Sequence, residues 1–479
     1  MPDAPSGRVQ ARTVKGFRDI LPHQIVARRR MIDRLRAVFE SHGFVPFDTP
    51  ALEYVDALLG LGEEGTKSLF RMKSPEGEDV ALRYDLTVPL ARVVSQYPNL
   101  PRPFRRYQVS PVWRADKPDP GRFREFTQFD IDSVGSPTVL ADAEILMAMD
   151  EAFTALGLTA YRIRYSSRKI LNSLLKYAGI EGEAGLRTLR TLDKLDKQGL
   201  KAVLLELGPG RMDASGDRIQ GLGLASSSIE RVERFVSLEG AAGGGRTGLL
   251  DAVESLFVAV DGAGEGIAEL REIDRYLAAE GIPDDRVAVD LSIARGLDYY
   301  TGPVFEAILT DLPEFGAVFG GGRYDGLVER FLGTKVEATG ASIGVDRLLA
   351  ALDRLGLVPQ GWATARVLTT VMDQGRIPDY LRMTRELRDA GIPAEIYMGG
   401  PAGMKKQFAY ADKVGIPVVL IAGSNEFEAG TVSIKDLREG KQREGDAADR
   451  EAWVKQRFGQ RTVPRAEMIA TIRSLLEAP

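Results

Sequence analysis

The chain contains no cysteine and only two histidines, His23 and His42, among its 479 residues. The absence of cysteine excludes disulfides, thiolate zinc sites and a cysteine nucleophile. Because there are two histidines, a metal site built from several histidine ligands is nearly excluded, and any Ser-His-Asp mechanism has to use one of them. Catalysis in this protein therefore has to rest mainly on other side chains.

The chain also lacks a long apolar run and a strong excess of charge. No apolar run reaches the roughly 18 residues that indicate a membrane span, and the N-terminus lacks the apolar core of a secretory signal. We therefore expect a cytoplasmic protein that does not enter a membrane. Lys and Arg number 63 and Asp and Glu 68, so the formal net charge is −5. This balance argues against a general coat for nucleic acid but permits a local basic patch.

Length and patterning predict several parts. Strand-like runs from Val80 to Asp132 predict an antiparallel sheet, and strand-like, glycine-rich segments resume at Val287. The intervening stretch is mostly helical and is rich in Lys and Arg between Arg187 and Lys201, so we expect an insertion there. After it, strands and helices alternate near the C-terminus, which predicts a separate α/β domain. The expected parts of this α+β chain are 1–164, 165–285, 286–357 and 365–479.

A helix is expected from about Gln24 to His42, followed by a segment, Phe44–Pro50, that contains two prolines. Proline cannot donate to a strand ladder, so this segment fits an edge strand or an extended entry to the sheet. Apolar Ile32, Leu35 and Phe39 on the helix would serve a subunit interface or an internal core equally well.

The segment from Arg114 to Asp130 has two strand-like runs around a turn rich in Pro, Asp and Gly, which predicts a long hairpin. Strand alternation sends Arg124, Phe126 and Gln128 to the same face as Asp130. Arginine suits a triphosphate because its planar fork binds oxygens bidentately, and a neighbouring phenylalanine can stack on a purine. On spacing alone, a solvated hairpin with ordinary surface arginines is an equally good interpretation.

A second chemistry-bearing segment runs from Ala294 to Glu306. It places Arg295 on a glycine-flanked turn before Tyr299 and Tyr300, so it can offer charge and phenolic hydroxyls to a small polar ligand. The structural alternative is a strand bounded by turns, with the tyrosines half-buried in the core.

Two further glycine-rich segments follow. Phe319–Leu327 contains three consecutive glycines, which let a ligand or a neighbouring strand approach closely, although the segment matches neither the Walker nor the GxGxxG pattern. A tight structural turn is the alternative. Ala338–Leu349 predicts a strand of small residues leading into a helix whose first turn holds Asp346 and Arg347. Arg347 there faces either a ligand or solvent.

Together these segments resemble the signature motifs of class II aminoacyl-tRNA synthetases, and specifically the histidyl-tRNA synthetase family. The resemblance runs from about Lys15 to Lys441 and is weakest in 165–285. The segments that carry it are, in chain order, Gly43–Pro50 (motif 1, at the dimer interface), Arg114–Asp132 (motif 2), Arg295–Tyr300 and Gly321–Gly326 (the two histidine-specific motifs) and Gly340–Arg347 (motif 3).

The resemblance implies an antiparallel-sheet catalytic core with a helical insertion and a C-terminal α/β anticodon-binding domain. It implies a ligase that activates histidine with ATP to histidyl-adenylate and transfers the histidyl group to the 3′ end of histidine tRNA. ATP is then a substrate accompanied by Mg²⁺, for which no protein ligand is assigned, and no organic cofactor is expected. The expected partners are histidine, ATP, histidine tRNA and a second copy of the chain.

The resemblance also implies residue roles, with Arg114 and Arg295 at the α-phosphate as the catalytic pair. Many members of the family have glutamate where this chain has Asp85 and Asp132. The residues implied for ATP are Arg114, Arg122, Phe126 and Arg347. Those implied for histidine are Asp85, Thr87, Gln128, Asp132, Arg295, Tyr299, Tyr300 and Tyr324. The arginines expected to make an acidic chain compatible with ATP and tRNA are Arg114, Arg122, Arg124, Arg295, Arg323 and Arg347.

Two alternatives remain at this point. A synthetase-like regulatory subunit of ATP phosphoribosyltransferase shares the core, but it lacks the anticodon domain and usually has eroded motifs. The presence of Arg114, Arg295, Arg347 and a domain at 365–479 favours the synthetase. A non-catalytic RNA-binding protein on the same scaffold is disfavoured by the intact motifs. In the C-terminal domain, Met404–Lys413 mixes basic and aromatic residues as single-stranded RNA recognition does, and a solvated helix explains any single residue as well.

Overall fold

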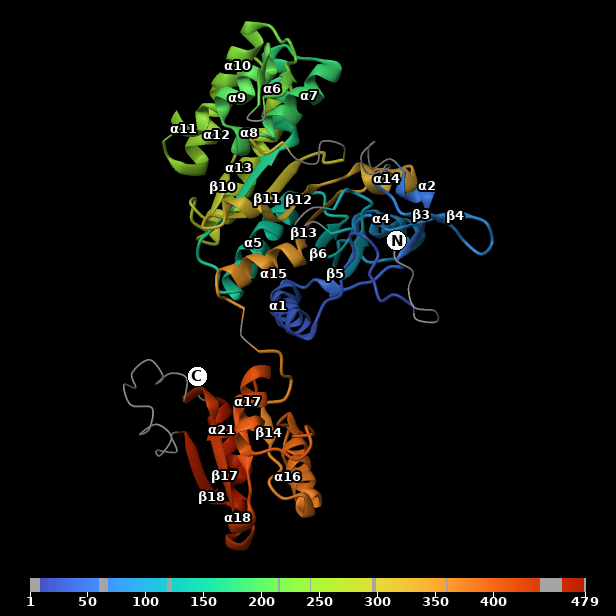
Figure 1. The fold of residues 1–479 in the computed structure, drawn as a ribbon. Helices are drawn as coiled ribbons and strands as arrows, with labels where there is room; N and C mark the ends of the chain where they lie inside the picture. Colours follow the sequence, from blue (N-terminus) through green and yellow to red (C-terminus); the bar gives the residue numbers. More distant parts are fainter. Residues whose placement is uncertain are drawn as a thin grey trace. The chain divides into compact units, whose positions relative to one another are not determined.

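The computed structural model divides the chain into two compact units. The first unit comprises Met1–Asp19 and Arg30–Leu357, and the second comprises Ile20–Arg29 and Val358–Pro479. The structure describes residues 9–59, 68–118, 123–213, 216–241, 243–294, 299–358, 361–439 and 459–477. The fold is α+β, with a large and mainly antiparallel sheet in the first unit and a mixed α/β arrangement in the second (Figure 1).

An eight-stranded sheet forms the centre of the first unit. Its inner neighbours pair antiparallel, and only the outermost pairs, β1 with β5 and β7 with β10, are parallel. The predicted antiparallel sheet is therefore confirmed, and the proline-containing segment after the first helix does form an edge strand. The strand order is β1 (Val45–Pro46), β5 (Phe104–Trp113), β6 (Glu125–Val134), β13 (Ala338–Gly344), β12 (Ala317–Arg323), β11 (Pro303–Leu309), β7 (Tyr161–Ser167) and β10 (Val287–Val289).

Helices α5 (Leu140–Ala155) and α15 (Val345–Arg354) lie along this sheet, next to β13 and β6 (Figure 1). The ring of Phe39 on α1 (Pro22–Ser41) meets that of Phe129 on β6 edge-on, with centroids 5.0 Å apart. Leu35 and Phe39 are 0% exposed and Ile32 is 8% exposed. These three apolar side chains thus belong to an internal core and not to a free subunit face.

Smaller elements complete the first unit. A three-stranded antiparallel sheet has the order β2, β4, β3. The elements are β2 (Leu52–Tyr54), α2 (Val55–Leu58), β3 (Arg71–Lys73), β4 (Asp79–Leu82), α4 (Thr87–Gln96), the short 3-10 helix η1 (Pro313–Phe315) and α14 (Gly326–Leu332).

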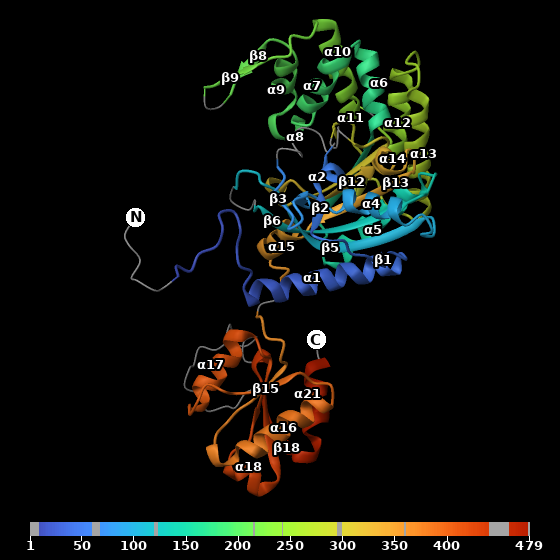
Figure 2. The ribbon, with the colours of Figure 1, turned by 90° about the vertical axis from the view of Figure 1, so that its right-hand side faces the viewer.

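The stretch between β7 and β10 is helical apart from one hairpin, as the sequence predicts (Figure 2). Its first helix begins where β7 ends, and the hydroxyl of Ser167 accepts the amide of Lys169 as a cap. The domain boundaries at 164 and 285 stay a prediction. The elements are α6 (Arg168–Ala178), α7 (Gly182–Leu192), α8 (Leu195–Gln198), α9 (Leu200–Leu207), β8 (Gly210–Met212), β9 (Arg218–Gln220), α10 (Ser226–Val236), α11 (Leu238–Ala241), α12 (Gly245–Leu256) and α13 (Ala263–Ala279).

The second unit has a five-stranded sheet in the order β15, β14, β16, β17, β18, with the first three strands parallel and the rest antiparallel. Apolar clusters form two cores, one around Tyr380 and Met468 and the other around Val414 and Ile416. The elements are β14 (Val367–Thr369), η2 (Gln374–Arg376), α16 (Ile377–Asp389), β15 (Ala394–Ile396), α17 (Met404–Val414), β16 (Val418–Ile421), α18 (Ser424–Ala429), β17 (Thr431–Asp436), β18 (Gln460–Pro464), η3 (Arg465–Glu467) and α21 (Met468–Glu477).

Within the described residues, no helix combines the length and the apolar character that crossing a membrane requires.

Candidate functional site

A cavity of about 570 Å³ opens over the middle of the eight-stranded sheet, between β6, β12, β13 and the start of α15. Its walls come from segments that are far apart in the sequence. Six of the residues expected for ATP or histidine line it: Arg114, Phe126, Gln128, Tyr299, Tyr300 and Arg347.

Arg114 follows the last residue of β5, and its guanidinium lies over two aromatic rings. The Cζ atom is 4.1 Å from the centroid of Tyr84 and 5.1 Å from that of Phe126. Its Nε donates to the carbonyl oxygen of Tyr84 at 3.3 Å. No carboxylate of the described residues lies within ion-pair distance of Arg114. The guanidinium of Arg114 therefore has no ion-pair partner at contact distance within the described chain.

Arg347 enters the cavity from the first turn of α15, as the predicted strand-to-helix junction requires. Its Nη1 donates to the carbonyl oxygen of Ala317 on β12 at 2.8 Å. The neighbouring Asp346 lies at the amino end of the same helix, where the helix dipole favours a negative charge. Arg347 is exposed at the cavity wall, so its role toward a ligand stays a prediction.

Gln128 and Asp130 extend the same face of β6 beyond Phe126. The amide Nε2 of Gln128 donates to Ser342 Oγ at 2.7 Å, while its Oε1 is buried without a hydrogen-bond partner among the described residues. Burial raises the pKa of Asp130 to about 7, opposed by the positive charge of Arg106.

Asp132 is the centre of a buried ion-pair cluster. The register of the sheet sets it between Arg106 on β5 and Gly340 on β13. Its Oδ2 is 2.8 Å from Nη2 of Arg106, which is 0% exposed, and its Oδ1 accepts the hydroxyl of Tyr324. Burial raises the pKa of Asp132, and Arg106 opposes this effect. The same burial raises the pKa of Tyr324 well above its usual value, so its hydroxyl stays a donor.

Asp85 and Thr87 lie at the start of α4, outside the residues that line the cavity. Asp85 Oδ1 accepts the amide of Val88 at 3.1 Å. Burial raises the pKa of Asp85, and the charge of Arg114 is among the effects that oppose it. Asp85 therefore lies close enough to Arg114 for the two charges to interact.

Tyr299 and Tyr300 lie side by side, with ring centroids 4.3 Å apart and hydroxyl oxygens 3.0 Å apart. The ring of Tyr300 packs against the apolar cluster that also contains Tyr324. Two residues of the expected site, Arg122 and Arg295, lie outside the described residues, so their roles stay predictions.

The three consecutive glycines lie inside strand β12 and not in a tight turn. A Cβ on Gly321 would lie 2.0 Å from the carbonyl oxygen of Gly340, and a Cβ on Gly340 would lie 2.0 Å from Asp132 Oδ1. Any side chain at either position would collide with the neighbouring strand or the buried carboxylate. Of the two partners predicted to approach the glycines closely, a ligand or a neighbouring strand, the structure shows the neighbouring strand β13.

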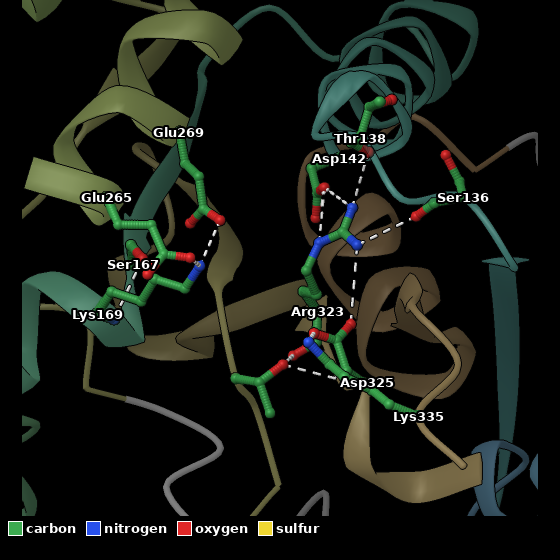
Figure 3. A network of polar contacts seen from close by, with 11 residues as sticks. Ser136, Thr138, Asp142, Ser167, Lys169, Glu265, Glu269, Arg323, Asp325 and Lys335 are labelled. Atoms are coloured by element: carbon green, nitrogen blue, oxygen red, sulfur yellow. Dashed lines mark hydrogen bonds and ion pairs between the residues drawn. The ribbon is translucent and has the colours of Figure 1, made fainter. Parts of the chain in front are cut away.

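One of the arginines expected to serve anionic partners, Arg323, is structural instead. Arg323 is 5% exposed and binds Asp142 on α5 and the carbonyl oxygens of Ser136 and Thr138 (Figure 3). Arg124 donates to the carbonyl oxygens of Asp116 and Lys15. The expectation for Arg323 was wrong because the packing supplies a buried carboxylate that the sequence does not reveal, whereas the expectation for Arg124 stays a prediction.

Three residues beside the cavity, Arg18, Arg106 and Ser342, were not predicted from the sequence, and neither was the bridging contact of Asp346. Arg106 is one of two adjacent arginines in its strand, and no pattern distinguishes it as the partner of Asp132. Within the described ranges, no group of three or more His, Asp or Glu side chains is arranged to hold a metal ion.

Comparisons with known proteins agree with this architecture. A family model described as histidyl-tRNA synthetase matches residues 16–348, and one described as anticodon binding domain matches residues 366–457. The chain is 45% identical to a histidine–tRNA ligase of Paracoccus denitrificans over 98% of both chains. It is 43% identical to the histidine–tRNA ligase of Caulobacter vibrioides, covering 98% of this chain and 97% of that one. The crystal structure of a histidyl-tRNA synthetase from Nostoc sp. PCC 7120 superposes with a TM-score of 0.81 at 30% identity, covering 98% of this chain and 100% of that chain.

Proposed function

The chain belongs to the histidyl-tRNA synthetase family and is a histidine–tRNA ligase, and on this premise we propose how its residues divide the work. The synthetase-like regulatory subunit considered above is set aside, because the ligase relatives match the chain at full length, including the second unit.

ATP, entering with Mg²⁺, occupies the cavity over the sheet. Phe126 and Arg347 hold the adenine from its two sides, and Arg114 binds the α-phosphate. The observation that carries this assignment is the lack of a carboxylate partner for Arg114, whose charge stays available at the wall of a cavity that Phe126 and Arg347 also line. Arginine is suited to this position because it stays charged and binds oxygens in a fork. Arg122 is assigned to the phosphates by its place in the sequence.

Histidine binds deeper along β6. Its α-amino group lies near Asp85, Thr87 and Gln128. The buried Oε1 of Gln128 lacks a hydrogen-bond partner within the described chain, so it can accept a bond from that group. The imidazole is held by Asp132 and the tyrosine hydroxyls. The residues assigned to the imidazole of the substrate are Asp132, Tyr299, Tyr300 and Tyr324. An analogue without ring nitrogens would leave buried polar groups unpaired, and such loss gives strong discrimination.

The reaction then needs little beyond positioning and charge. A carboxylate oxygen of histidine attacks the α-phosphorus, the bond to pyrophosphate breaks, and the developing charge is stabilised by Arg114 and Arg295. In the second step a hydroxyl of the terminal tRNA adenosine attacks the activated carbonyl and AMP leaves. This chemistry requires no cysteine or histidine nucleophile, in agreement with a chain that has no cysteine and only two histidines.

The second unit binds the anticodon arm of histidine tRNA through α17. Lys405 and Lys406 are exposed on this helix, and Nζ of Lys435 lies 5.2 Å from the ring centroid of Phe408. Gln407 is structural, since its amide bonds the backbone of Val371 from both sides. The exposed lysines supply the charge that a phosphate backbone requires. The protein acts in the cytoplasm, where translation takes place.

The working protein is a homodimer. Strand β1 lies at one edge of the eight-stranded sheet, and its Val45 is 48% exposed. On β2, the side chains of Leu52 and Tyr54 are 46% and 51% exposed. An edge strand with exposed apolar side chains nearby favours a protein partner. Light scattering should give twice the mass of the chain, and a monomeric mass in active protein would contradict the dimer.

A histidine-dependent pyrophosphate-exchange assay tests the residue roles. Arg295→Ala should abolish exchange while ATP binding persists, because the residue is assigned to the reacting phosphate. Arg114→Ala should lose exchange by a factor of about 100 or more, the usual cost of removing one charged donor from a transition state. Folded variants that exchange like the unaltered protein would refute the assignment of the altered residue.

A further inference from the structure

The N-terminal segment before α1 lies against the hairpin that carries Arg114. The amide of Arg124 donates to the carbonyl oxygen of Gly16 at 2.9 Å, and the amide of Arg114 donates to the carbonyl oxygen of Arg124 at 2.8 Å. The ring of Phe17 meets that of Phe70 edge-on at 5.9 Å. The segment is thus tied by its backbone to Arg124, which precedes β6 and pairs with the cavity arginine.

Arg18 is the side chain by which this segment reaches the cavity wall. Its Cζ lies 3.8 Å from the ring centroid of Phe123, and its Nη2 is 2.8 Å from Asp346 Oδ1. Phe123 and Asp346 both line the cavity, one before β6 and the other in the first turn of α15. The second oxygen of Asp346 accepts the amide of Thr127 at 2.9 Å. One guanidinium therefore joins two walls of the cavity that come from different parts of the chain.

The chemistry of these contacts favours arginine over lysine. A planar guanidinium can lie flat on a ring and still donate in its plane to a carboxylate, whereas an ammonium group can approach a ring or a carboxylate but has no flat face to stack. The side chains of Arg18 and Asp346 are 33% and 12% exposed, so the pair is partly shielded from water and weakly screened compared with a surface pair.

We propose that Arg18 is a positioning residue of the ATP site: it holds Phe123 and Asp346 together and so fixes the start of α15, which carries Arg347. The inference rests on the proposed function, in which this cavity takes ATP. Histidine, assigned deeper along β6, depends on none of these contacts. Loss of Arg18 should therefore weaken ATP binding and leave histidine binding nearly unchanged.

The test compares Arg18→Ala, Arg18→Lys and Asp346→Asn with Arg12→Ala. Arg12 is an exposed residue of the same segment and has no hydrogen bond, ion pair or ring contact within the described chain. Equilibrium ATP binding, the KM values for ATP and for histidine in exchange, and the melting temperature are measured for each. We expect Arg18→Ala to weaken ATP binding roughly tenfold, with the histidine KM changed less than about twofold. Arg18→Lys should restore part of the loss, and Arg12→Ala should match the unaltered protein.

A double variant strengthens the test. Because Arg18 and Asp346 serve one contact, Arg18→Ala combined with Asp346→Asn should be no worse than the more damaging single change. ATP binding by Arg18→Ala that equals that of the unaltered protein would overturn the inference. An equal rise in both KM values with a lower melting temperature would overturn it too, since a merely structural role predicts that pattern. Failure of the unaltered protein to bind ATP would instead refute the proposed function, and the inference with it.

Discussion

His42 is held between two carboxylates of α5, and replacing it by glutamine should destabilise the first unit in a pH-dependent way. Its Nδ1 is 3.0 Å from Oε1 of Glu144, and its Nε2 is 3.1 Å from Oε2 of Glu151. Arg105 also reaches Glu144, at 3.0 Å. Since both ring nitrogens face acceptors, both must carry protons, so the contact requires the charged imidazolium. Glutamine keeps a polar side chain there but no charge.

The size of the effect follows from the two titrations. The hydrogen bond from His42, with help from Arg105, lowers the pKa of Glu144 from 4.5 to about 2. At about 1.4 kcal/mol per pKa unit this shift corresponds to about 3 kcal/mol. Glu144 is 31% exposed, so solvent screening reduces the expected loss of unfolding free energy on His42→Gln to about 1 kcal/mol.

The pH range is set by the direction of each shift. The two glutamates raise the pKa of His42 above 6.5, so its contribution is complete below pH 6.5 and is lost as the pH rises through the raised value. The contribution of Glu144 is present above pH 4.5 and is lost as the pH falls toward 2. The contact should therefore stabilise the protein most between about pH 4.5 and 6.5.

The assay compares the unaltered protein with His42→Gln in denaturant unfolding at pH 5.5 and 8.5. We expect a difference of about 1 kcal/mol at pH 5.5 and little at 8.5. Because the chain has two histidines, labelled imidazoles give two resonances, and the variant identifies that of His42. An equal difference in unfolding free energy at both pH values would show that His42 is not a charged partner of the two glutamates. A His42 resonance that titrates below pH 6.5 would show the same.

Three further changes test other parts of the structure. Gly340→Ala, whose Cβ would lie 2.0 Å from Asp132 Oδ1, should raise the histidine KM by roughly tenfold or more while the ATP KM stays within about twofold; an unchanged histidine KM would contradict it. Arg323→Met strands the carboxylate of Asp142, whose pKa burial already raises to about 6, so unfolding experiments should show a loss of about 3 kcal/mol at pH 8 and less at pH 5, where the carboxylate takes up a proton. Gln407→Met removes the partners of buried backbone groups and should lower the stability of the second unit by about 2 kcal/mol, with exchange retained, whereas loss of exchange would argue against separate roles for the units.

The sequence predicts the regular elements well where periodicity is strong. The hairpin around Arg114, the strand-to-helix junction at Arg347 and the alternation in the second unit are all found. Strand β18 was missed because Gln460–Pro464 is short and mostly polar, as a strand at the edge of a sheet can be. Alternation also identified Phe126 and Gln128 as neighbours on one face, and both line the cavity.

The fate of each arginine could not be predicted, and the reason is physical. A guanidinium binds a phosphate, a carboxylate or a carbonyl oxygen with the same fork, so its role depends on which acceptor the tertiary structure brings to it. Arg106 meets the buried carboxylate of Asp132 across the β5–β6 pair, and Arg323 meets that of Asp142 on a helix remote in the sequence. The charges of Arg106 and Arg323 are thus neutralised by ion pairs within the protein.

Arg114 differs from these buried arginines in one respect that bears on function. Within the described chain it meets a backbone carbonyl and two aromatic rings but no carboxylate at ion-pair distance. A cation stacked on rings keeps its charge, and the ring faces exclude water from one side. The scaffold thus neutralises the arginines that hold strands together and leaves a cation at the cavity, where a phosphate can supply the missing negative charge. This separation explains how an acidic chain can bind a polyanionic substrate: its net charge is an average over pairs that cancel, whereas binding depends on the charge that has no internal partner.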